Sequence, residues 1–293
     1  MSFPAQTSGP DLVVTVRPAR PEDYAVFVRL FPELAVEEPV PAQAVFEREM
    51  MATTLIAEAA RAGAAPGPVG YAYFQIVKTT AYVRNVVTAP DARQRGVGRA
   101  MMGEIARRAL AAGCTSWCLN VKPENVAAIA LYERLGLARA FESRALRISW
   151  SSVGARQTLH DATISARVIE PADDARVEPP MKLLPGQLAA ARPLPGRVLL
   201  GLFDEDDVLG ATVLDPKFPG AYPFRVARPD LALVLLDALR PYVRSSDETI
   251  NVVVEDQPAV ADALVAAGAS VKLEIVHMSS STIATGVPVA DDR

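Results

Sequence analysis

The residues best suited to chemistry form a short basic segment that contains two glycines, Arg93-Gln94-Arg95-Gly96-Val97-Gly98-Arg99. Glycines two positions apart at a helix start let the backbone turn tightly and leave N–H groups uncovered at the positive end of the helix. The segment therefore predicts a pyrophosphate site, in which the arginines pair with phosphate oxygens in bidentate fashion. The alternative interpretation is a loop relaxed by glycine with a solvated basic edge.

Regular elements must flank this segment for it to bind an anion. The β-branched run from Tyr82 to Thr88 predicts a strand before it, and Ala100 to Ala112 predicts a helix after it. Thr54–Glu58 and Val69–Val77 predict two earlier strands, so three consecutive strands should form an antiparallel meander. The other elements expected in this half are strands at 12–16, 116–121 and 140–150, and helices at 24–30 and 126–135.

Two motifs in this half resemble those of a known family. The run Val87 to Met102 and the later L-N-V-K-P-E-N-V-A-A-I-A-L-Y-E-R-L-G-L look like the two acyl-CoA-binding motifs of the GNAT superfamily of N-acetyltransferases. The opening V-R-P-A-R-P-E-D is similar to the family's first strand and turn. The resemblance covers residues 11 to 150. It implies acetyl-CoA as the cofactor and a three-layer α+β fold, in which helices flank a mixed, mostly antiparallel sheet.

The resemblance also implies a role for each residue of the site. The strand before the signature splays from its neighbour in this family, so its exposed backbone would pair with the pantetheine arm. Asn125 would hydrogen-bond the arm while capping its helix. Tyr132, two helical turns further on the same face, would lie beside the departing sulfur. The expected cofactor-binding residues are Val86, Val87, Thr88, Arg93, Gln94, Arg95, Gly96, Val97, Gly98, Arg99, Asn125 and Tyr132.

The catalytic base is the open part of the expected mechanism. A lysine-like amine is neutral in only roughly one molecule in 2,500 at pH 7, which corresponds to about 4.6 kcal/mol. Family members often place a glutamate where this chain has Tyr82, so either Glu58 on a neighbouring strand or a water held by the backbone is expected to act as the base. The Val87 N–H would stabilise the oxyanion, and Tyr132 would be the general acid, in direct transfer within a ternary complex.

Composition limits the class of protein. The 293 residues suffice for two domains. A net charge of −4 and a pI of about 5.4 exclude an overall positive charge that would attract nucleic acid or an anionic membrane. Two cysteines, Cys114 and Cys118, exclude a disulfide framework, and no metal site is expected. No apolar run approaches the roughly 20 residues that span a bilayer, and no signal peptide is evident. We expect a cytoplasmic protein, as a monomer or a homodimer.

The second half repeats the first weakly. Residues 166–173 resemble residues 16–23 at an offset of 150, and the order of predicted strands and helices from 208 to 278 follows that of the first half. We therefore expect a second GNAT-like domain. The predicted boundaries are a tail at 1–10, a cofactor-binding domain at 11–150, a linker at 151–163, a second domain at 164–284 and a tail at 285–293.

The second domain lacks the residues of the site. Aligning the two Pro-Asp pairs places Ala232, Leu235 and Asp237 at the positions of Arg93, Gly96 and Gly98, and aligning the helix ends places Gln257 and Leu264 at those of Asn125 and Tyr132. We expect that domain neither to bind acyl-CoA nor to catalyse. The chain as a whole is expected to be an N-acetyltransferase acting on a primary amine of a small molecule or peptide. The alternative, favoured only by the glutamate missing at position 82, is a non-catalytic acyl-CoA sensor or scaffold.

Overall fold

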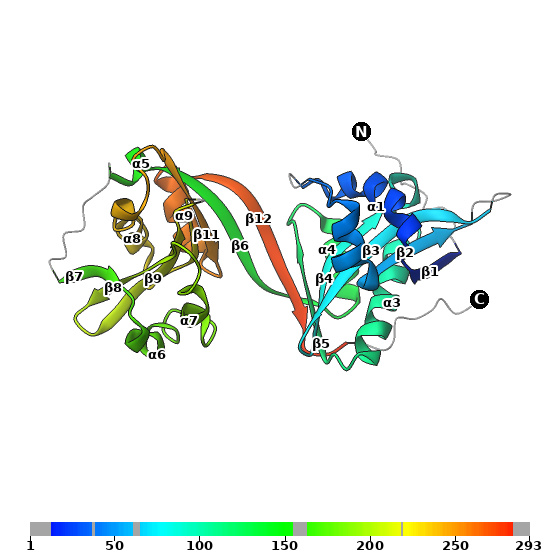
Figure 1. The fold of residues 1–293 in the computed structure, drawn as a ribbon, viewed down its shortest axis with the longest axis horizontal. Coiled ribbons are helices and arrows are strands. Elements are labelled where there is room, and N and C mark those ends of the chain that lie inside the picture. The colour runs from blue at the N-terminus through cyan, green and yellow to red at the C-terminus, as the bar shows by residue number, and fades with distance from the viewer. Residues whose placement is uncertain (1–12, 37–38, 61–64, 155–162, 218, 284–293) are drawn as a thin grey trace, which may run out of the picture. The chain divides into compact units, whose positions relative to one another are not determined.

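A computed structural model of the chain describes residues 13–36, 39–60, 65–154, 163–217 and 219–283 (Figure 1). The predicted tails and residues 155–162 of the predicted linker lie outside them. The chain divides into two compact units, Met1–Ala140 with His277–Arg293, and Phe141–Val276. The division falls within two strands, β6 (Ala138–Ser149) and β12 (Ser270–Ser280).

Each unit thus includes part of a strand from the other half of the sequence. In both cases this strand comes directly after the last helix of that other half. Most of β6 follows the first half but belongs to the second unit, where it pairs antiparallel with β11 from Thr249↔Ser149 to Glu255↔Ser143. The end of β12, from His277, belongs to the first unit. The units therefore differ from the predicted spans 11–150 and 164–284 at both closing strands, because the alternation within a strand does not specify which strand it pairs with.

The first unit is built on strands in the order β1-β2-β3-β4-β5. Strands β1 to β4 pair antiparallel in succession, which confirms the predicted meander, and β4 pairs parallel with β5. The strands are β1 (Val14–Pro18), β2 (Thr54–Ala59), β3 (Gly67–Val77), β4 (Thr80–Thr88) and β5 (Ser116–Val121); the helices are α1 (Tyr24–Leu30), α2 (Gln43–Val45), α3 (Val97–Ala111) and α4 (Val126–Arg134), with short turns η1 (Pro21–Asp23), η2 (Phe31–Leu34), η3 (Phe46–Met50), η4 (Met51–Thr53) and η5 (Pro90–Ala92).

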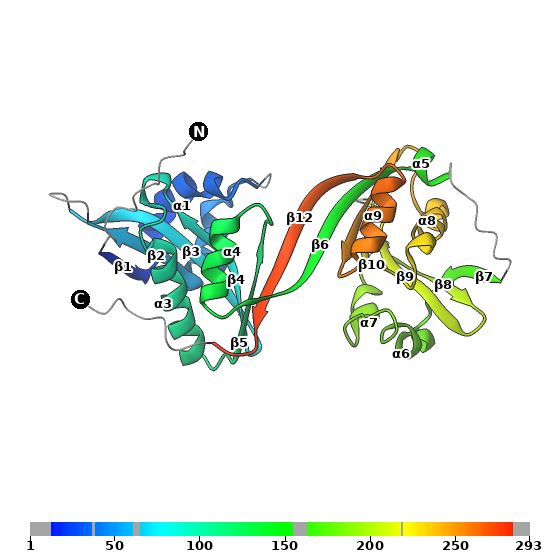
Figure 2. The same cartoon turned by 180° about the vertical axis from the view of Figure 1, so that it is seen from behind.

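Helices cover both faces of this sheet (Figure 2). Gly70 in β3 lies under α3, since a Cβ built there would lie 3.2 Å from side-chain atoms of Val97 and Met101. The next residue, Tyr71, packs on Phe27 of α1 with ring centroids 5.0 Å apart. Because neighbouring residues of a strand point to opposite faces, α1 and α3 cover opposite faces of the sheet.

The second unit reproduces this sequence of pairings. Strands β7 to β10 pair antiparallel in succession, and β10 pairs parallel with β11, as β1 to β5 do in the first unit. The elements are β7 (Ile164–Val168), β8 (Val198–Asp204), β9 (Asp207–Asp215), β10 (Gly220–Val226), β11 (Thr249–Glu255), α5 (Trp150–Gly154), α6 (Asp174–Val177), α7 (Gln187–Ala191), α8 (Ala232–Asp237) and α9 (Pro258–Ala266), with turns η6 (Pro171–Asp173), η7 (Pro229–Leu231) and η8 (Arg240–Tyr242).

An equivalent ion pair opens both units. Arg17 donates to both carboxylate oxygens of Asp23 at 2.7 and 2.9 Å, and Arg167 does the same to Asp173 at 2.6 and 2.9 Å. Each guanidinium lowers the pKa of its aspartate. Each aspartate also accepts the backbone N–H three residues earlier, at 2.7 and 3.0 Å. The two pairs are 150 residues apart, which is the offset of the sequence repeat.

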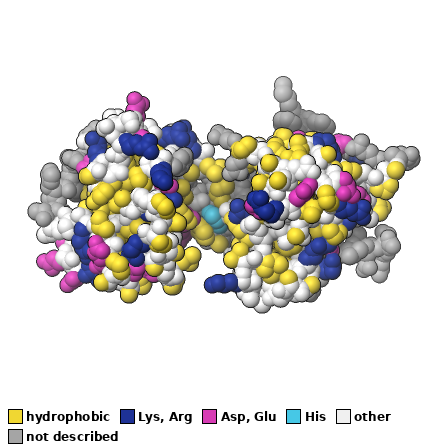
Figure 3. Space-filling model, in the orientation of Figure 1, with side chains coloured by type: hydrophobic (Ala, Val, Ile, Leu, Met, Phe, Trp, Pro, Cys, Tyr) yellow, Lys and Arg dark blue, Asp and Glu magenta, His cyan; other side chains and the backbone are white. Residues whose placement is uncertain are grey.

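Charged side chains of both signs are interspersed on the molecular face that Figure 3 presents. That face carries no continuous basic patch among the described residues. No helix in the described ranges has both the length and the apolar character that a bilayer crossing requires.

Candidate functional site

Strands β4 and β5 pair over only part of their length. Their register runs from Thr80↔Ser116 to Val83↔Leu119, whereas β4 continues to Thr88. Beyond Val83 the edge of β4 that faces β5 therefore has no strand partner among the described residues. We call the region beside β4 residues 84–88, where β4 and β5 are no longer paired, the β4–β5 gap.

A β-bulge lies where the two strands separate. On the other edge of β4, Asn85 opposes Tyr73 and Val83 opposes Phe74, so Arg84 is an extra residue without a partner in β3. A bulge bends its strand and increases the local twist. The end of β4 can thus turn away from β5 while it remains paired with β3.

Alternation along β4 decides which backbone groups face the gap. The Ala89 N–H donates to the Val69 carbonyl at 2.8 Å, in the register of the β3–β4 pair. Because hydrogen-bonding direction alternates along an antiparallel strand, the N–H of Val87 also faces β3, and those of Val86 and Thr88 face the gap. The N–H of Val87, the predicted oxyanion donor, thus points toward β3, whereas the N–H groups of Val86 and Thr88 point toward the gap.

The basic segment forms a tight loop that leads from β4 into α3. Gln94 and Gly96 adopt left-handed conformations with φ of 60° and 82°, and α3 begins directly afterwards at Val97. Gly98, in the first turn, lies close to α4, since a Cβ built there would lie 3.1 Å from Leu131. The predicted glycine loop and helix start are therefore present, and a helix start of this kind points the N–H groups of its first turn toward the loop.

The three arginines of the loop are exposed. Arg93 donates to the Thr88 carbonyl at 3.3 Å and pairs with Glu33 of η2 at 2.5 Å. Its guanidinium thus lies beside the last residue of β4, at the loop end of the β4–β5 gap. The sequence does not indicate that Glu33 belongs to this site, because Glu33 and Arg93 are 60 positions apart.

The predicted residues of α4 lie on the helix as expected. Asn125 caps α4, since its side chain accepts the Ala128 N–H at 3.2 Å. Tyr132 is 8% exposed, and burial raises the pKa of its phenol to about 12. Among the described residues its hydroxyl has no hydrogen-bond partner, so it is free to donate to a ligand.

Neither candidate for the base is a free carboxylate beside the gap. Glu58 lies on β2, which β3 separates from β4, and its carboxylate pairs with Arg17 at 2.8 Å. Tyr82 stands in the paired part of β4, where its hydroxyl accepts from Asn120 at 2.6 Å and Arg84 stacks 4.7 Å from the ring centre. Burial raises the pKa of the Tyr82 phenol, so Tyr82 stays neutral near pH 7.

The cysteines do not form a nucleophilic site. Cys114 is buried, and burial raises the pKa of the half-buried Cys118 thiol. A raised pKa disfavours the thiolate that covalent catalysis needs.

In the second unit the equivalent gap is filled by the protein's own side chains. Strands β10 and β11 pair only at Gly220↔Asn251 and Ala221↔Val252. Beyond these pairs, Gln257 donates to the Val226 carbonyl at 2.6 Å and accepts its N–H at 3.4 Å. Val226 corresponds to Thr88, since each opposes the equivalent glycine of the preceding strand.

A second contact closes the same opening, and the loop is missing. Arg225 donates to the carbonyl of Glu255 and pairs with its carboxylate at 3.0 Å. The turn η7 leads straight into α8, where Ala232 and Leu235 are fully buried. Leu264 of α9, at the position of Tyr132, is also fully buried. Neither an anion loop nor a phenol is therefore found at these positions of the second unit.

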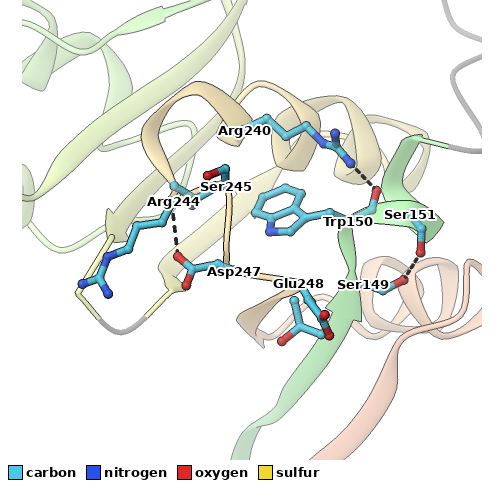
Figure 4. Close-up of a pocket in the computed structure, with 10 residues that line it drawn as sticks. Ser149, Trp150, Ser151, Arg240, Arg244, Ser245, Asp247 and Glu248 are labelled. Carbon is cyan, nitrogen blue, oxygen red and sulfur yellow. Dashed lines mark hydrogen bonds between the residues drawn. The ribbon is translucent and has the colours of Figure 1, made fainter.

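The second unit has a separate hollow of about 600 Å³ at the start of β11 (Figure 4). Trp150 lies in its wall, with Arg240 donating to the Trp150 carbonyl at 2.7 Å. The filled β10–β11 gap lies at the other end of β11. The hollow contains none of the residues predicted to form a site.

Part of the chain matches a family of known proteins. Residues 24–137 match the model of the acetyltransferase (GNAT) family. The chain is 36% identical over 70 residues to [ribosomal protein bS18]-alanine N-acetyltransferase of Escherichia coli (strain K12), which covers 24% of this chain and 47% of that protein. The protein of that name from Salmonella typhimurium (strain LT2) matches equally. The chain thus spans about half the length of the curated relatives it matches.

Solved structures share the fold over nearly the whole chain. A GCN5-related N-acetyltransferase from Sphaerobacter thermophilus superposes with a TM-score of 0.61 at 17% identity, covering 94% of this chain and 97% of that one. A tandem GNAT protein from the clavulanic acid biosynthesis pathway gives 0.50 at 16% identity, covering 91% and 98%. At these identities the likeness concerns the fold alone. Residues 24–137 are therefore similar to the acetyltransferase (GNAT) family.

Proposed function

We propose that the first unit transfers the acetyl group of acetyl-CoA directly to a primary amine. The observation that carries this proposal is the β4–β5 gap, where two backbone N–H groups of β4 point away from β3 beyond its pairing with β5, next to a glycine loop and a helix start. A long ligand with an anionic middle and a hydrogen-bonding arm suits that combination.

The residues present fit this cofactor. The loop and the first turn of α3 offer N–H groups and positive charge for the pyrophosphate, and the exposed Arg95 and Arg99 lie beside it. The arm would run from the loop along β4, so it reaches Thr88 before Val86. When bound, acetyl-CoA supplies a thioester whose carbonyl carbon the amine attacks.

The backbone of β4 then has two separate tasks. Thr88, nearer the loop, pairs with the arm. Val86, farther along, donates its N–H to the carbonyl oxygen as that oxygen gains negative charge. A fixed donor of this kind stabilises developing charge without reorganisation and is worth roughly 3–4 kcal/mol in other acyl-transfer enzymes.

Tyr132 would act on the departing sulfur. Its pKa of about 12 lies about 3.5 units above that of an ordinary thiol, so complete proton transfer would be uphill by about 5 kcal/mol. We infer that Tyr132 stabilises the sulfur through a hydrogen bond from its neutral hydroxyl. The amine's own proton is then available to neutralise the thiolate.

The site favours an amine that is weakly basic. With Glu58 paired to Arg17 and Tyr82 neutral, the site offers little help in deprotonating a lysine-like amine. An α-amine, with a pKa near 8, is neutral in roughly one molecule in ten at pH 7 and needs about 3 kcal/mol less help. The relative named for alanine N-acetylation has an α-amine as its acceptor, which supports this choice.

Two matched peptides test the proposal. One carries a free α-amine and an acetylated lysine; the other has the same sequence with a blocked amino terminus and a free lysine. Thiol release from acetyl-CoA at pH 7 should favour the first peptide by on the order of 100-fold in kcat/KM. Tyr82→Glu should lower the ratio of kcat/KM between the two peptides, because the new carboxylate can act as a base for the lysine amine. Equal rates, or a preference for lysine in the wild type, would contradict the assignment of the acceptor.

We further propose that the second unit binds no acyl-CoA. Gln257 already satisfies the backbone groups of Val226, and Arg225 bridges to Glu255. A pantetheine arm would have to displace these internal contacts without an anion loop to hold its pyrophosphate.

A further inference from the structure

Glu33 forms an ion pair with Arg93, which is one of the residues proposed to bind the pyrophosphate. Its carboxylate lies 2.5 Å from Nη2 of Arg93, the first residue of the loop, and the two side chains are 33% and 52% exposed. A guanidinium that pairs with a carboxylate offers fewer donors and less net charge to a second anion. Glu33 and a bound pyrophosphate would therefore compete for one group.

The segment that carries Glu33 is held in place on both sides of it. Phe31 is buried against Phe27, with ring centroids 5.4 Å apart. Ala35 has a left-handed conformation with φ of 49°, and its carbonyl accepts from Lys122 at 2.7 Å. Lys122 follows β5 and Arg93 follows β4, so residues 31–35 contact the chain at the exits of both strands that border the gap. The backbone that carries Glu33 is thus anchored close to the loop.

We propose that Glu33 competes with the cofactor's pyrophosphate for Arg93 and thereby weakens the hold of the site on acetyl-CoA and on product CoA alike. The inference rests on the proposed function. Both forms carry the same pyrophosphate, and binding energy common to substrate and product does not lower the barrier of the chemical step. A weaker common hold speeds the release of CoA, a step that limits turnover in many enzymes.

Glu33→Gln tests the competition, with binding of CoA followed by titration calorimetry. Removal of the carboxylate should tighten CoA binding by about two- to five-fold, the range expected for one exposed ion pair. The affinity of Glu33→Gln for CoA should also fall more steeply as the salt concentration rises. Without its carboxylate partner, Arg93 attracts the phosphates with its full charge, and salt screens that attraction. Glu22→Gln is the matched control: Glu22 faces Arg20 at 4.0 Å in another exposed pair, and its loss should leave the affinity unchanged.

A double mutant isolates the contact from general charge effects. In the Arg93→Gln background, Glu33→Gln should no longer change the affinity for CoA. Weaker binding in Glu33→Gln would overturn the inference, because it would make Glu33 a residue that positions Arg93 for the pyrophosphate. A wild type that binds CoA, with unchanged affinity in Glu33→Gln, would also overturn it and leave the proposed function intact. A wild type that binds no CoA would contradict the proposed function itself.

Discussion

Tyr132 carries the most specific chemical assignment in the chain. Its phenol is buried, has no hydrogen-bond partner among the described residues, and has a pKa raised to about 12. Tyr132→Phe removes only the hydroxyl and its hydrogen bond to the sulfur, so kcat should fall by on the order of 100-fold with little change in acetyl-CoA affinity.

The pH dependence provides a second measurement of the same residue. A raised pKa keeps the phenol protonated below about pH 11, so the wild type should show no loss of kcat from Tyr132 between pH 7 and 10. A descending limb in that range that disappears in Tyr132→Phe would show that the phenol ionises there, against this account.

At single residues, the sequence predicts the features that a local rule decides. Gly96 is left-handed and Asn125 caps its helix, as glycine spacing and helix-start preferences predict. No local rule predicts which way the Val87 N–H points or whether the Glu58 carboxylate has a partner. The direction of an N–H depends on pairing with β3, and the availability of Glu58 depends on Arg17, 41 positions away.

At the scale of helices and strands, the close approach of α3 to β3 positions the anion loop. A Cβ on Gly70 would lie 2.7 Å from the Val87 carbonyl and 3.2 Å from Met101 of α3. Gly70→Ala should therefore force β3, β4 and α3 apart and lower the free energy of unfolding by roughly 1–3 kcal/mol.

Gly67→Ala is the matched control in the same strand, since a Cβ there meets no atom within 4 Å. Chemical denaturation of both variants measures the difference. Equal stabilities would mean that α3 does not press on β3 as closely as the structure has it.

Most elements could be predicted from periodicity and end signals. The meander, the strand Ser116–Val121 and the helix that ends before Gly136 follow local rules and were found. Strands β8 and β10 were not predicted. β10 contains Pro223, which strand rules penalise, and β8 follows a stretch rich in proline and glycine that obscures its start.

At the scale of the whole molecule, both units have the same pattern of strands with a gap at the equivalent place. The gap of the second unit is filled by the protein's own side chains. In the first unit the N–H groups of Val86 and Thr88 face the opening, and in the second Gln257 occupies the equivalent position. The repeat was visible in the sequence, but the filled gap was not, because a glutamine two residues beyond a strand does not show which backbone it binds.

The division of the chain inside β6 and β12 also could not be predicted. In both strands apolar and polar residues alternate, and both strands follow a helix. The sequence therefore predicts each as the last strand of its own half. The unit to which a strand belongs depends on long-range pairing, for which the sequence of the strand alone gives no rule.

The central claim is that the β4–β5 gap of the first unit is the site of acetyl-CoA in this chain. Titration calorimetry of the whole chain tests it most directly, with Gly96→Asp to place a carboxylate in the anion loop. Gly113→Asp is the control: Gly113 is also left-handed, with φ of 79°, but follows the other end of α3.

We predict one acetyl-CoA bound per chain in the wild type and in Gly113→Asp, and none in Gly96→Asp. Two molecules per chain, or binding that survives Gly96→Asp unchanged, would contradict the account.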